Sequence, residues 1–323
     1  MKEIGGYLEL ELKDRGDFLH SDGICLNSGR NALEYILISC SGISKIWIPY
    51  FTCEVILEPI RKLNIPYSFY SINERLEIER LLQLGESEYL LYTNYYGIKE
   101  QYICYLSKLY GQKLIVDNAQ ALYADRIENI KTFYSPRKFV GIPDGGIAYT
   151  GNMVEANYMQ DVSYDRCMHL LKRLELEAIE GYNDFRINSG KLVGQPISMM
   201  SLLSRKILSS IDFLAIRKKR RENFEKLHEA LMNRNLLDIS DFGFFECPMI
   251  YPYYVDDKTL RKKLIDNKIY VATYWPNVLK WCSEDKLEYE LTSNIIALPI
   301  DQRYGSEEMN YITTVPLKSE KVL

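Results

Sequence analysis

The chain has 323 residues, of which 47% are hydrophobic, enough to fill a large globular core with room for a smaller second domain. Its formal net charge is −4 and both signs are mixed along the sequence, which argues against nucleic acid or an anionic membrane as a partner. The seven cysteines form no CxxC pair and have no ligand-like spacing to the three histidines, so we expect neither a disulfide framework nor a metal site.

The N-terminal stretch does not have the pattern of a targeting signal. Residues 1–18 carry charges every few positions and lack the apolar run of a signal peptide. No later apolar run approaches the ~20 residues that a membrane span requires. We therefore expect a cytoplasmic protein without a membrane partner.

Strand-like and helix-like patterns alternate through the first half of the chain. Runs of β-branched and aromatic residues predict strands over 44–51, 65–72, 88–96 and 113–118. Apolar residues spaced three and four apart predict helices over 53–64, 74–85 and 100–112. This alternation predicts an α/β fold, a mostly parallel sheet covered by helices on both faces, with ligands at the carboxyl ends of its strands.

The second half is mostly helical at first and then mixed. The pattern is helical from about 154 to 235, with an irregular interruption over 180–196 and a long helix over 205–235. Further strand-like segments, separated by helical ones, predict a small C-terminal α+β domain; they cover 244–255, 267–276 and 294–300. We predict a large domain over 1–205 and a linking helix and small domain over 206–323, closely packed because no low-complexity linker separates them.

A first candidate site lies in "ICLNSGRNALEYILIS", residues 24–39. A short strand runs into Ser-Gly and then a helix, so the amides of Gly29 and Arg30 are placed to hold an anion at the helix N-terminus. The Arg30 side chain would add a charge-assisted contact. The alternative is a plain N-cap at Asn27 or Ser28, with the glycine easing the turn.

A second candidate is "LIVDNAQALYA", residues 113–123, where a buried strand delivers Asp117 and Gln120 follows. A carboxylate at the end of a parallel strand lies where ligands bind, and it would hold a protonated ring nitrogen by a charge-assisted hydrogen bond. The alternative is that Asp117 only caps the next helix.

A third candidate is "FYSPRKFVGIPDGG", residues 133–146. A partly enclosed Lys138 would lose its proton readily and attack a carbonyl, helped by the positive charge of Arg137, and Ser135 offers a hydroxyl for a phosphate. The alternative is an ordinary surface lysine before a turn. A phosphate seat, an acid for a ring nitrogen and a lysine, in that order, are the parts that pyridoxal phosphate needs.

At this point the sequence resembles the DegT/DnrJ/EryC1/StrS family, the sugar aminotransferases with the aspartate aminotransferase fold (fold type I). The likeness spans nearly the whole chain, through "LNSGRNALEYIL", "IWIPYFTCEVILEPI", "TNYYG", "LIVDNAQAL", "SPRKFVGIPDGG", "GYNDFRI", "RKKRRENFEKL" and "IIALPIDQRYGSEEM". The resemblance implies a pyridoxal-phosphate-dependent aminotransferase that moves an amino group, from glutamate, to a nucleotide-linked keto-sugar in polysaccharide or glycan precursor biosynthesis. Related dehydratases carry histidine where this chain has Lys138, which favours amine transfer.

The resemblance also implies a role for each matching residue. Lys138 would hold the cofactor covalently and move the proton, Asp117 would bind the pyridine nitrogen, and Gln120 would lie near the ring. The Gly29 and Arg30 amides would bind the phosphate, together with a hydroxyl from Ser135 or Thr132. Asn183 would reach the phosphate of the neighbouring subunit, which implies a homodimer with shared active sites.

Two departures from the family pattern keep alternatives open. Arg30 replaces the usual threonine, and Cys53 stands where an aromatic residue often stacks on the cofactor, so ring packing would fall to Phe51 or Tyr95. These departures leave room for a homologue that binds cofactor or sugar without turnover, as a sensor or scaffold.

A further alternative is an enzyme with the same cofactor that acts on a small amino or keto acid. Tyr274, Trp275 and Arg186 favour a nucleotide-linked sugar, although core packing and ordinary surface exposure explain these residues equally well.

Overall fold

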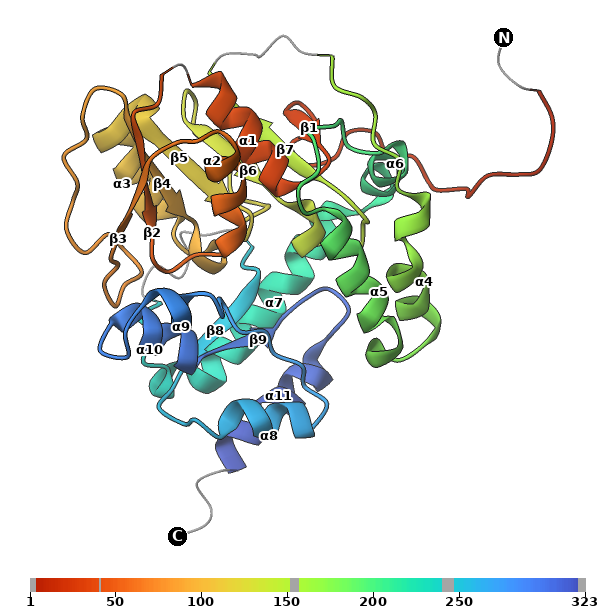
Figure 1. Ribbon diagram of the computed structural model, residues 1–323. Coiled ribbons are helices and arrows are strands. Elements are labelled where there is room, and N and C mark those ends of the chain that lie inside the picture. Colours follow the sequence, from red (N-terminus) through yellow and green to blue (C-terminus); the bar gives the residue numbers. More distant parts are fainter. Residues whose placement is uncertain (1–3, 41, 152–156, 240–246, 319–323) are drawn as a thin grey trace.

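The computed structural model describes residues 4–40, 42–151, 157–239 and 247–318 (Figure 1). A seven-stranded sheet forms its larger part, in the order β1-β7-β6-β5-β4-β2-β3. The strands are β1 (Ile24–Leu26), β2 (Lys45–Pro49), β3 (Tyr67–Tyr70), β4 (Glu88–Thr93), β5 (Leu114–Asn118), β6 (Lys131–Tyr134) and β7 (Gly146–Tyr149). Strands β2 to β6 pair in parallel, and β7 runs antiparallel to both β1 and β6. The predicted mostly parallel sheet is confirmed.

Helices cover both faces of this sheet because its strands are apolar on both faces. Leu91 of β4 and Ile115 of β5 point toward α1 (Gly29–Ser39) and α2 (Leu57–Lys62). Their neighbours Leu90 and Leu114 point to the opposite face, where they belong to the same core as Ile103 of α3 (Glu100–Tyr110). Because successive side chains of a strand point to opposite faces, each strand contributes to two separate hydrophobic cores.

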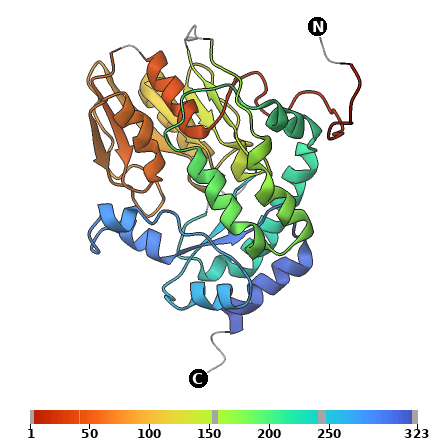
Figure 2. The same cartoon turned by 45° about the vertical axis from the view of Figure 1, so that its right-hand side comes forward.

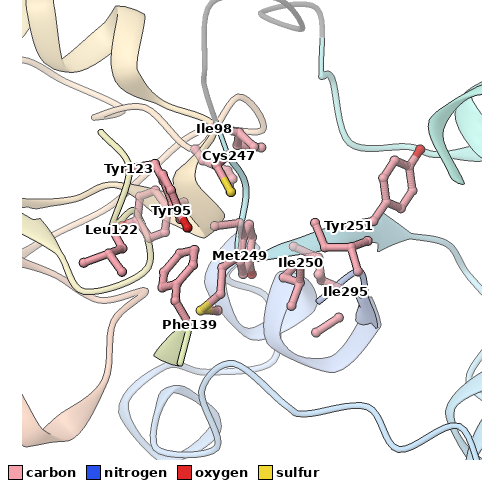
Figure 3. Close-up of a cluster of buried hydrophobic side chains, with 14 of the residues drawn as sticks. Tyr95, Ile98, Leu122, Tyr123, Phe139, Cys247, Met249, Ile250, Tyr251 and Ile295 are labelled. Carbon is pink, nitrogen blue, oxygen red and sulfur yellow. The ribbon is translucent and has the colours of Figure 1, made fainter. Parts of the chain in front are cut away.

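The C-terminal part is a two-stranded antiparallel sheet with surrounding helices, which confirms the predicted α+β character. Its elements are β8 (Ile250–Tyr254), β9 (Ile295–Pro299), α8 (Leu260–Asp266), α9 (Val278–Trp281), α10 (Leu287–Asn294) and α11 (Ser306–Lys318). Figure 3 shows the seam with the larger sheet, where Phe139 and Tyr95 approach Met249. Because one core runs through this seam, the boundary at residues 205 and 206 stays a prediction.

The helix predicted over 74–85 is wrong. The Oδ1 of Asn73 accepts hydrogen bonds from the amides of Arg75 and Glu77, each at 3.0 Å, and Leu76 has a positive φ of 59°. An asparagine that bonds to its own backbone a few residues on favours a turn over a helix. The apolar residues of this segment still face the core, but from an irregular loop.

The irregular interruption predicted over 180–196 is also wrong over most of its length. Helix α5 (Ala178–Lys191) runs through it and packs beside α4 (Met168–Glu175), as Figures 1 and 2 show in green. A Cβ on Gly181 would lie 3.1 Å from the carbonyl oxygen of His169. Gly181, which suggested a loop in the sequence, therefore allows α4 and α5 to pack closely.

Two further predictions differ in detail. The helix over 205–235 is divided into α6 (Leu202–Ser210) and α7 (Phe213–Leu231), because Asp212 caps the second one through the amide of Ala215 at 2.9 Å. Segment 267–276 forms only an isolated bridge between Ala272 and Ala297. Residues 154–156 and 244–246 of the predicted segments lie outside the described residues. None of the described helices is both long and apolar enough to cross a membrane.

Candidate active site

The carboxyl ends of β4, β5 and β6 bring the sequence candidates to one edge of the sheet. Asp117, near the end of β5, pairs in register with Phe133 of β6. Its side chain is buried, and its Oδ1 accepts a hydrogen bond from the amide of Ala119 at 2.8 Å. Burial raises the pKa of Asp117, and the charge of Lys138 lowers it in part. The carboxylate and the lysine are therefore electrostatic neighbours.

Lys138 ends a short 3₁₀ turn, η4 (Pro136–Lys138), directly after β6. Its neighbour Phe139 is buried in the seam of Figure 3, and the Phe139 carbonyl accepts hydrogen bonds from Gln302 Nε2 at 2.9 Å and Arg220 Nη2 at 3.3 Å. The Lys138 side chain is exposed on the wall of a cavity. The backbone around this lysine is thus fixed from both parts of the chain, while the amine remains accessible.

The N-terminus of α1 supplies amides beside this edge. Ser28 caps the helix: its Oγ accepts a hydrogen bond from the amide of Asn31 at 3.1 Å. The N-cap that the sequence offered as the alternative is therefore present at Ser28. Within the described part of the chain, the Arg30 amide has no hydrogen-bond partner. The Arg30 guanidinium is engaged elsewhere: its Nε lies 3.3 Å from Glu58 Oε2, and its Nη1 donates to the Leu192 carbonyl at 3.2 Å. An anion here would meet the Arg30 amide, not its side chain.

The hydroxyl beside that amide is Ser135. A Cβ on Gly29 would lie 3.5 Å from Ser135 Cβ and 3.7 Å from its Oγ, so the serine lies against the start of α1. Thr132 is buried within β6, and its Oγ1 donates to the Ile130 carbonyl at 3.4 Å. Of the two hydroxyls considered from the sequence, the geometry favours Ser135.

The glycine pair at 145 and 146 holds the start of α1 in place. A Cβ on Gly146 would lie 2.2 Å from the Ser28 carbonyl oxygen and 2.6 Å from the Gly29 nitrogen. The amide of Gly145 donates to the Asn27 carbonyl at 2.8 Å, and Gly145 has a φ of 137°. Only glycine permits this backbone contact. The two glycines thus influence the site indirectly, because they position the backbone of residues 27–29 at the start of α1.

Gln120 and Cys53 complete the surroundings of the lysine. Gln120 Oε1 accepts the amide of Tyr96 at 2.9 Å, while its Nε2 is buried without a hydrogen-bond partner. Cys53 lies close enough to Lys138 for the lysine charge to oppose the rise in its thiol pKa that burial causes. A buried donor with nothing to bind is the kind of group that a ligand oxygen would satisfy.

The aromatic residues expected to pack on a cofactor ring face the core instead. Phe51 and Tyr95 are completely buried with ring centroids 5.5 Å apart, and Trp275 lies 5.1 Å from Phe51. Tyr274 is the aromatic residue nearer the site: burial raises its pKa to about 12, and the charge of Cys53 adds to that rise.

Asn183 and Arg186 do not join this group in the single chain. Both are exposed on α5. The buried asparagine of that helix is Asn188, whose Nδ2 donates to the Pro143 carbonyl at 2.9 Å. Helix α5 therefore has two asparagines with different surroundings: Asn188 is buried and bonded to the fold, and Asn183 is exposed to solvent.

A cavity of about 740 Å³ opens beside Lys138. Its walls come from η4 and the following loop, from α4 and α5, and from the C-terminal part. Cationic residues line it together with aromatic ones: Arg137, Lys138, Arg173, Arg220, Arg303, Tyr182, Phe185 and Tyr270. Arg220 and Arg303 are engaged, the first with the Phe139 and Met249 carbonyls and the second with Asp301.

Sequence reasoning missed His169 and treated Arg137 only as a nearby charge. His169 lies in α4 and lines the same cavity. Its spacing to the other candidates follows no recognisable motif, and the helix hairpin that brings it to Arg137 was not expected. Its position in the sequence carried no signal of its role.

No protein-family model matches the chain, and no curated protein sequence matches it. Solved structures do match. NtdA from Bacillus subtilis, with bound cofactor PMP, has a TM-score of 0.63 at 15% identity, over 91% of this chain and 72% of that one. A DegT DnrJ EryC1 StrS aminotransferase from Brucella abortus has a TM-score of 0.59 at 16% identity, over 92% and 86%.

PseC from Helicobacter pylori, an aminotransferase involved in the biosynthesis of pseudoaminic acid, has a TM-score of 0.60 at 13% identity, over 93% of this chain and 86% of that one. At such identities the likeness concerns the fold. The resemblance seen in the motifs is confirmed at that level: the chain has the fold of the DegT/DnrJ/EryC1/StrS aminotransferases.

Proposed function

We propose that this chain is a pyridoxal-phosphate-dependent aminotransferase that transfers an amino group from glutamate to a nucleotide-linked keto-sugar, for polysaccharide or glycan precursors. The observation that carries the proposal is the pairing of Lys138 with Asp117: Lys138 lies on a cavity wall, and its charge lowers the pKa of the buried carboxylate near the end of β5. Structural neighbours that include aminotransferases, one of them crystallised with PMP, support it.

The residues around Lys138 fit this cofactor. The Arg30 amide at the start of α1 and the Ser135 hydroxyl form a seat for a phosphate. Asp117 is the partner for a ring nitrogen, and the unpaired Nε2 of Gln120 is a donor for a ring oxygen. Backbone amides hold two of these groups, that of Ala119 the Asp117 carboxylate and that of Tyr96 the Gln120 amide oxygen, which supports the proposal.

The protein's part in the reaction follows from these positions. When bound, pyridoxal phosphate supplies a ring that accepts the electron pair left on a substrate carbon when its proton departs. The Lys138 Nζ takes that proton as a general base and returns it as a general acid. The Asp117 carboxylate holds a proton on the ring nitrogen, and its burial strengthens that interaction because little water competes with it.

The cavity favours a nucleotide-linked sugar over a small amino or keto acid. A volume of about 740 Å³ is large for a substrate of a few heavy atoms. Its cationic side suits phosphate groups, and its aromatic side, with Tyr182 and Phe185 at a ring-centroid distance of 6.4 Å, suits planar or sugar rings.

We also propose a cytoplasmic homodimer with shared active sites. The α4–α5 hairpin exposes apolar side chains over both helices: Met168, Leu171, Leu174, Leu176, Ile179, Tyr182, Phe185 and Ile187. An apolar surface of this extent on one hairpin is typical of an interface. A second copy docked there would bring the exposed Asn183 toward the cofactor phosphate of its neighbour.

Absorption spectroscopy tests the proposal. Purified protein incubated with pyridoxal phosphate is expected to show the visible band of the lysine-bound cofactor, and glutamate is expected to bleach it. Lys138→Ala should abolish the band, whereas Lys268→Ala, at a highly exposed surface lysine, should leave it unchanged.

Two results would contradict the proposal. A wild-type protein that shows no band after incubation is not a pyridoxal phosphate enzyme. A band that persists in Lys138→Ala assigns the covalent link to another lysine. A panel of nucleotide-linked keto-sugars, with amine transfer followed by mass spectrometry, then identifies the acceptor, and small keto acids serve as the competing substrates.

A further inference from the structure

The cavity beside Lys138 contains a guanidinium, that of Arg137, with no hydrogen-bond partner among the described residues. Arg137 precedes the lysine in η4, and it makes neither a hydrogen bond nor an ion pair with the residues that the structure describes. Its Nε is completely buried. Burial lowers the pKa of Arg137 to about 10, with Arg30 and Arg166 adding to that decrease. A polar atom that is buried without a hydrogen-bond partner is costly, so the buried Nε of this partly buried side chain points to an anion supplied from outside the chain.

The nearest acid does not fill this role. Asp144 raises the pKa of Arg137, so the two groups are electrostatic neighbours. Both oxygens of Asp144 are engaged, however: they accept hydrogen bonds from the Ser201 amide at 2.8 Å, from the Ser201 hydroxyl at 2.6 Å and from the Ser204 hydroxyl. The carboxylate is committed to the start of α6, and no hydrogen bond links it to the guanidinium.

A second unpartnered group lines the same cavity. His169 is 8% exposed, and its Nδ1 is buried without a hydrogen-bond partner. Burial lowers its pKa, the charge of Arg137 lowers it further, and a hydrogen bond with the Arg166 backbone raises it in part. The Arg137 and His169 side chains are therefore close enough to interact. The His169 ring is held edge-on to Phe185, with ring centroids 5.8 Å apart. A neutral imidazole in this position can donate one hydrogen bond.

We propose that Arg137 and His169 form an oxyanion-binding subsite that holds a carboxylate or phosphate group of the substrate in the cavity beside Lys138. A planar guanidinium presents several N–H groups to such an anion, and the imidazole adds one more. The cavity wall includes Lys138 but not Asp117, Gln120 or Ser135. Assigning the anion to the substrate of that lysine therefore rests on the proposed aminotransferase function. The subsite itself rests on the place of the two side chains in the cavity and on their buried, unbonded nitrogens, Arg137 Nε and His169 Nδ1.

Calorimetric titration of the cofactor-loaded protein tests the subsite. Two unreactive probes distinguish the source of the anion: glutarate represents the carboxylates of an amino donor, and uridine diphosphate represents a nucleotide-linked sugar. Arg137→Gln is expected to weaken at least one probe about 10- to 100-fold, as for the loss of charged hydrogen bonds. His169→Gln should weaken the same probe by a smaller factor.

Arg173→Gln is the matched control, because Arg173 lines the same cavity but is exposed. Its affinity for both probes should change less than about threefold, in line with a solvent-screened charge. Unchanged binding of both probes to Arg137→Gln would overturn the subsite. So would an equal loss in Arg173→Gln, which would indicate a diffuse positive field. A loss of cofactor affinity alone would assign Arg137 to the cofactor and would also overturn it.

The stability of the variants keeps the test independent of activity. Arg137→Gln removes a partly buried charge that has no hydrogen-bond partner, so its urea midpoint is expected to match or exceed that of the wild type. If this variant fails to fold, His169→Gln provides the binding result. The same titration on protein without cofactor separates the two proposals. A protein that does not bind pyridoxal phosphate yet binds a probe through Arg137 would refute the proposed function and leave the subsite standing. A protein that binds pyridoxal phosphate through Lys138 but binds both probes equally well in Arg137→Gln would refute only the subsite.

Discussion

The carboxyl edge of the sheet and the α4–α5 hairpin differ in how their residues are held. At the edge, Asp117 lies near the end of β5, Ser135 and Lys138 follow β6, and the backbone of Gly146 packs against that of Ser28. On the hairpin, two helices pack on each other and leave large apolar side chains in solvent. The candidate residues of the edge lie together within one chain, whereas the hairpin exposes an apolar surface of the kind that interfaces use.

The largest effect that separates these regions is expected from a glycine in each. Gly146→Ala should lower the free energy of unfolding by about 3 kcal/mol, because its Cβ would lie 2.2 Å from the Ser28 carbonyl oxygen and no rotamer relieves that contact. Gly190→Ala, in α5 with no atom within 4 Å, should raise stability by up to about 1 kcal/mol. Urea denaturation measures both. Equal losses of unfolding free energy in Gly146→Ala and Gly190→Ala would contradict the difference between the sheet edge and the hairpin.

Two asparagines of the hairpin form the next pair. Asn188→Ala removes the donor to the Pro143 carbonyl and should cost about 2 kcal/mol of unfolding free energy, since both groups are buried. Asn183→Ala should change stability by less than about 0.5 kcal/mol, because the side chain is exposed. Its effect should appear in cofactor affinity, measured by titration with pyridoxal phosphate. Unchanged affinity would remove Asn183 from the partner's site.

A third test concerns the apolar surface of the hairpin. Ile179→Asp places a charge in the proposed interface and should raise the dimer dissociation constant at least about tenfold. Leu109→Asp, at a comparably apolar exposed position on α3, should leave it unchanged. Sedimentation at a series of concentrations measures both. A wild-type chain that stays monomeric throughout would refute the proposed homodimer.

The same contrast explains how far the sequence alone could be interpreted. Strand periodicity and chain order place Asp117 and Lys138 at one edge, because parallel strands end on the same side of a sheet. The sequence could not reveal that Gly181 allows two helices to touch, since a glycine marks a loop and a close contact equally well. It also could not show that the Arg30 guanidinium turns to Glu58, because that depends on where α2 lies.

The contact between Arg137 and His169 in the cavity could not be predicted from the sequence either. They are 32 positions apart in the sequence and meet only because the α4–α5 hairpin folds back toward η4. Local patterns describe neighbours along one element, and contacts between elements depend on packing that those patterns do not encode. The parts of the site that lie on the sheet were therefore predictable, and those supplied by the hairpin were not.

The smallest effect, and the sharpest test of the edge, concerns Asp117 in the cofactor-free protein. Burial raises its pKa in the folded state, so the native protein binds that proton more tightly than the unfolded chain does. Its ionised form therefore destabilises the fold, and this loss grows as the pH rises from the unfolded pKa, roughly 4, toward the folded one. The charge of Lys138 offsets part of it.

Asp117→Asn removes the charge and keeps an oxygen for the Ala119 amide. We expect the variant to be more stable than the wild type at neutral pH and equally stable in acid below the unfolded pKa, as measured by urea denaturation over a pH series. It should at the same time lose the ability to hold a protonated ring nitrogen. A variant that is less stable at neutral pH would show that the carboxylate serves the fold. A gain in stability would show that the chain keeps a buried charge at this edge for its ligand, as the unpaired Arg137 suggests for the cavity.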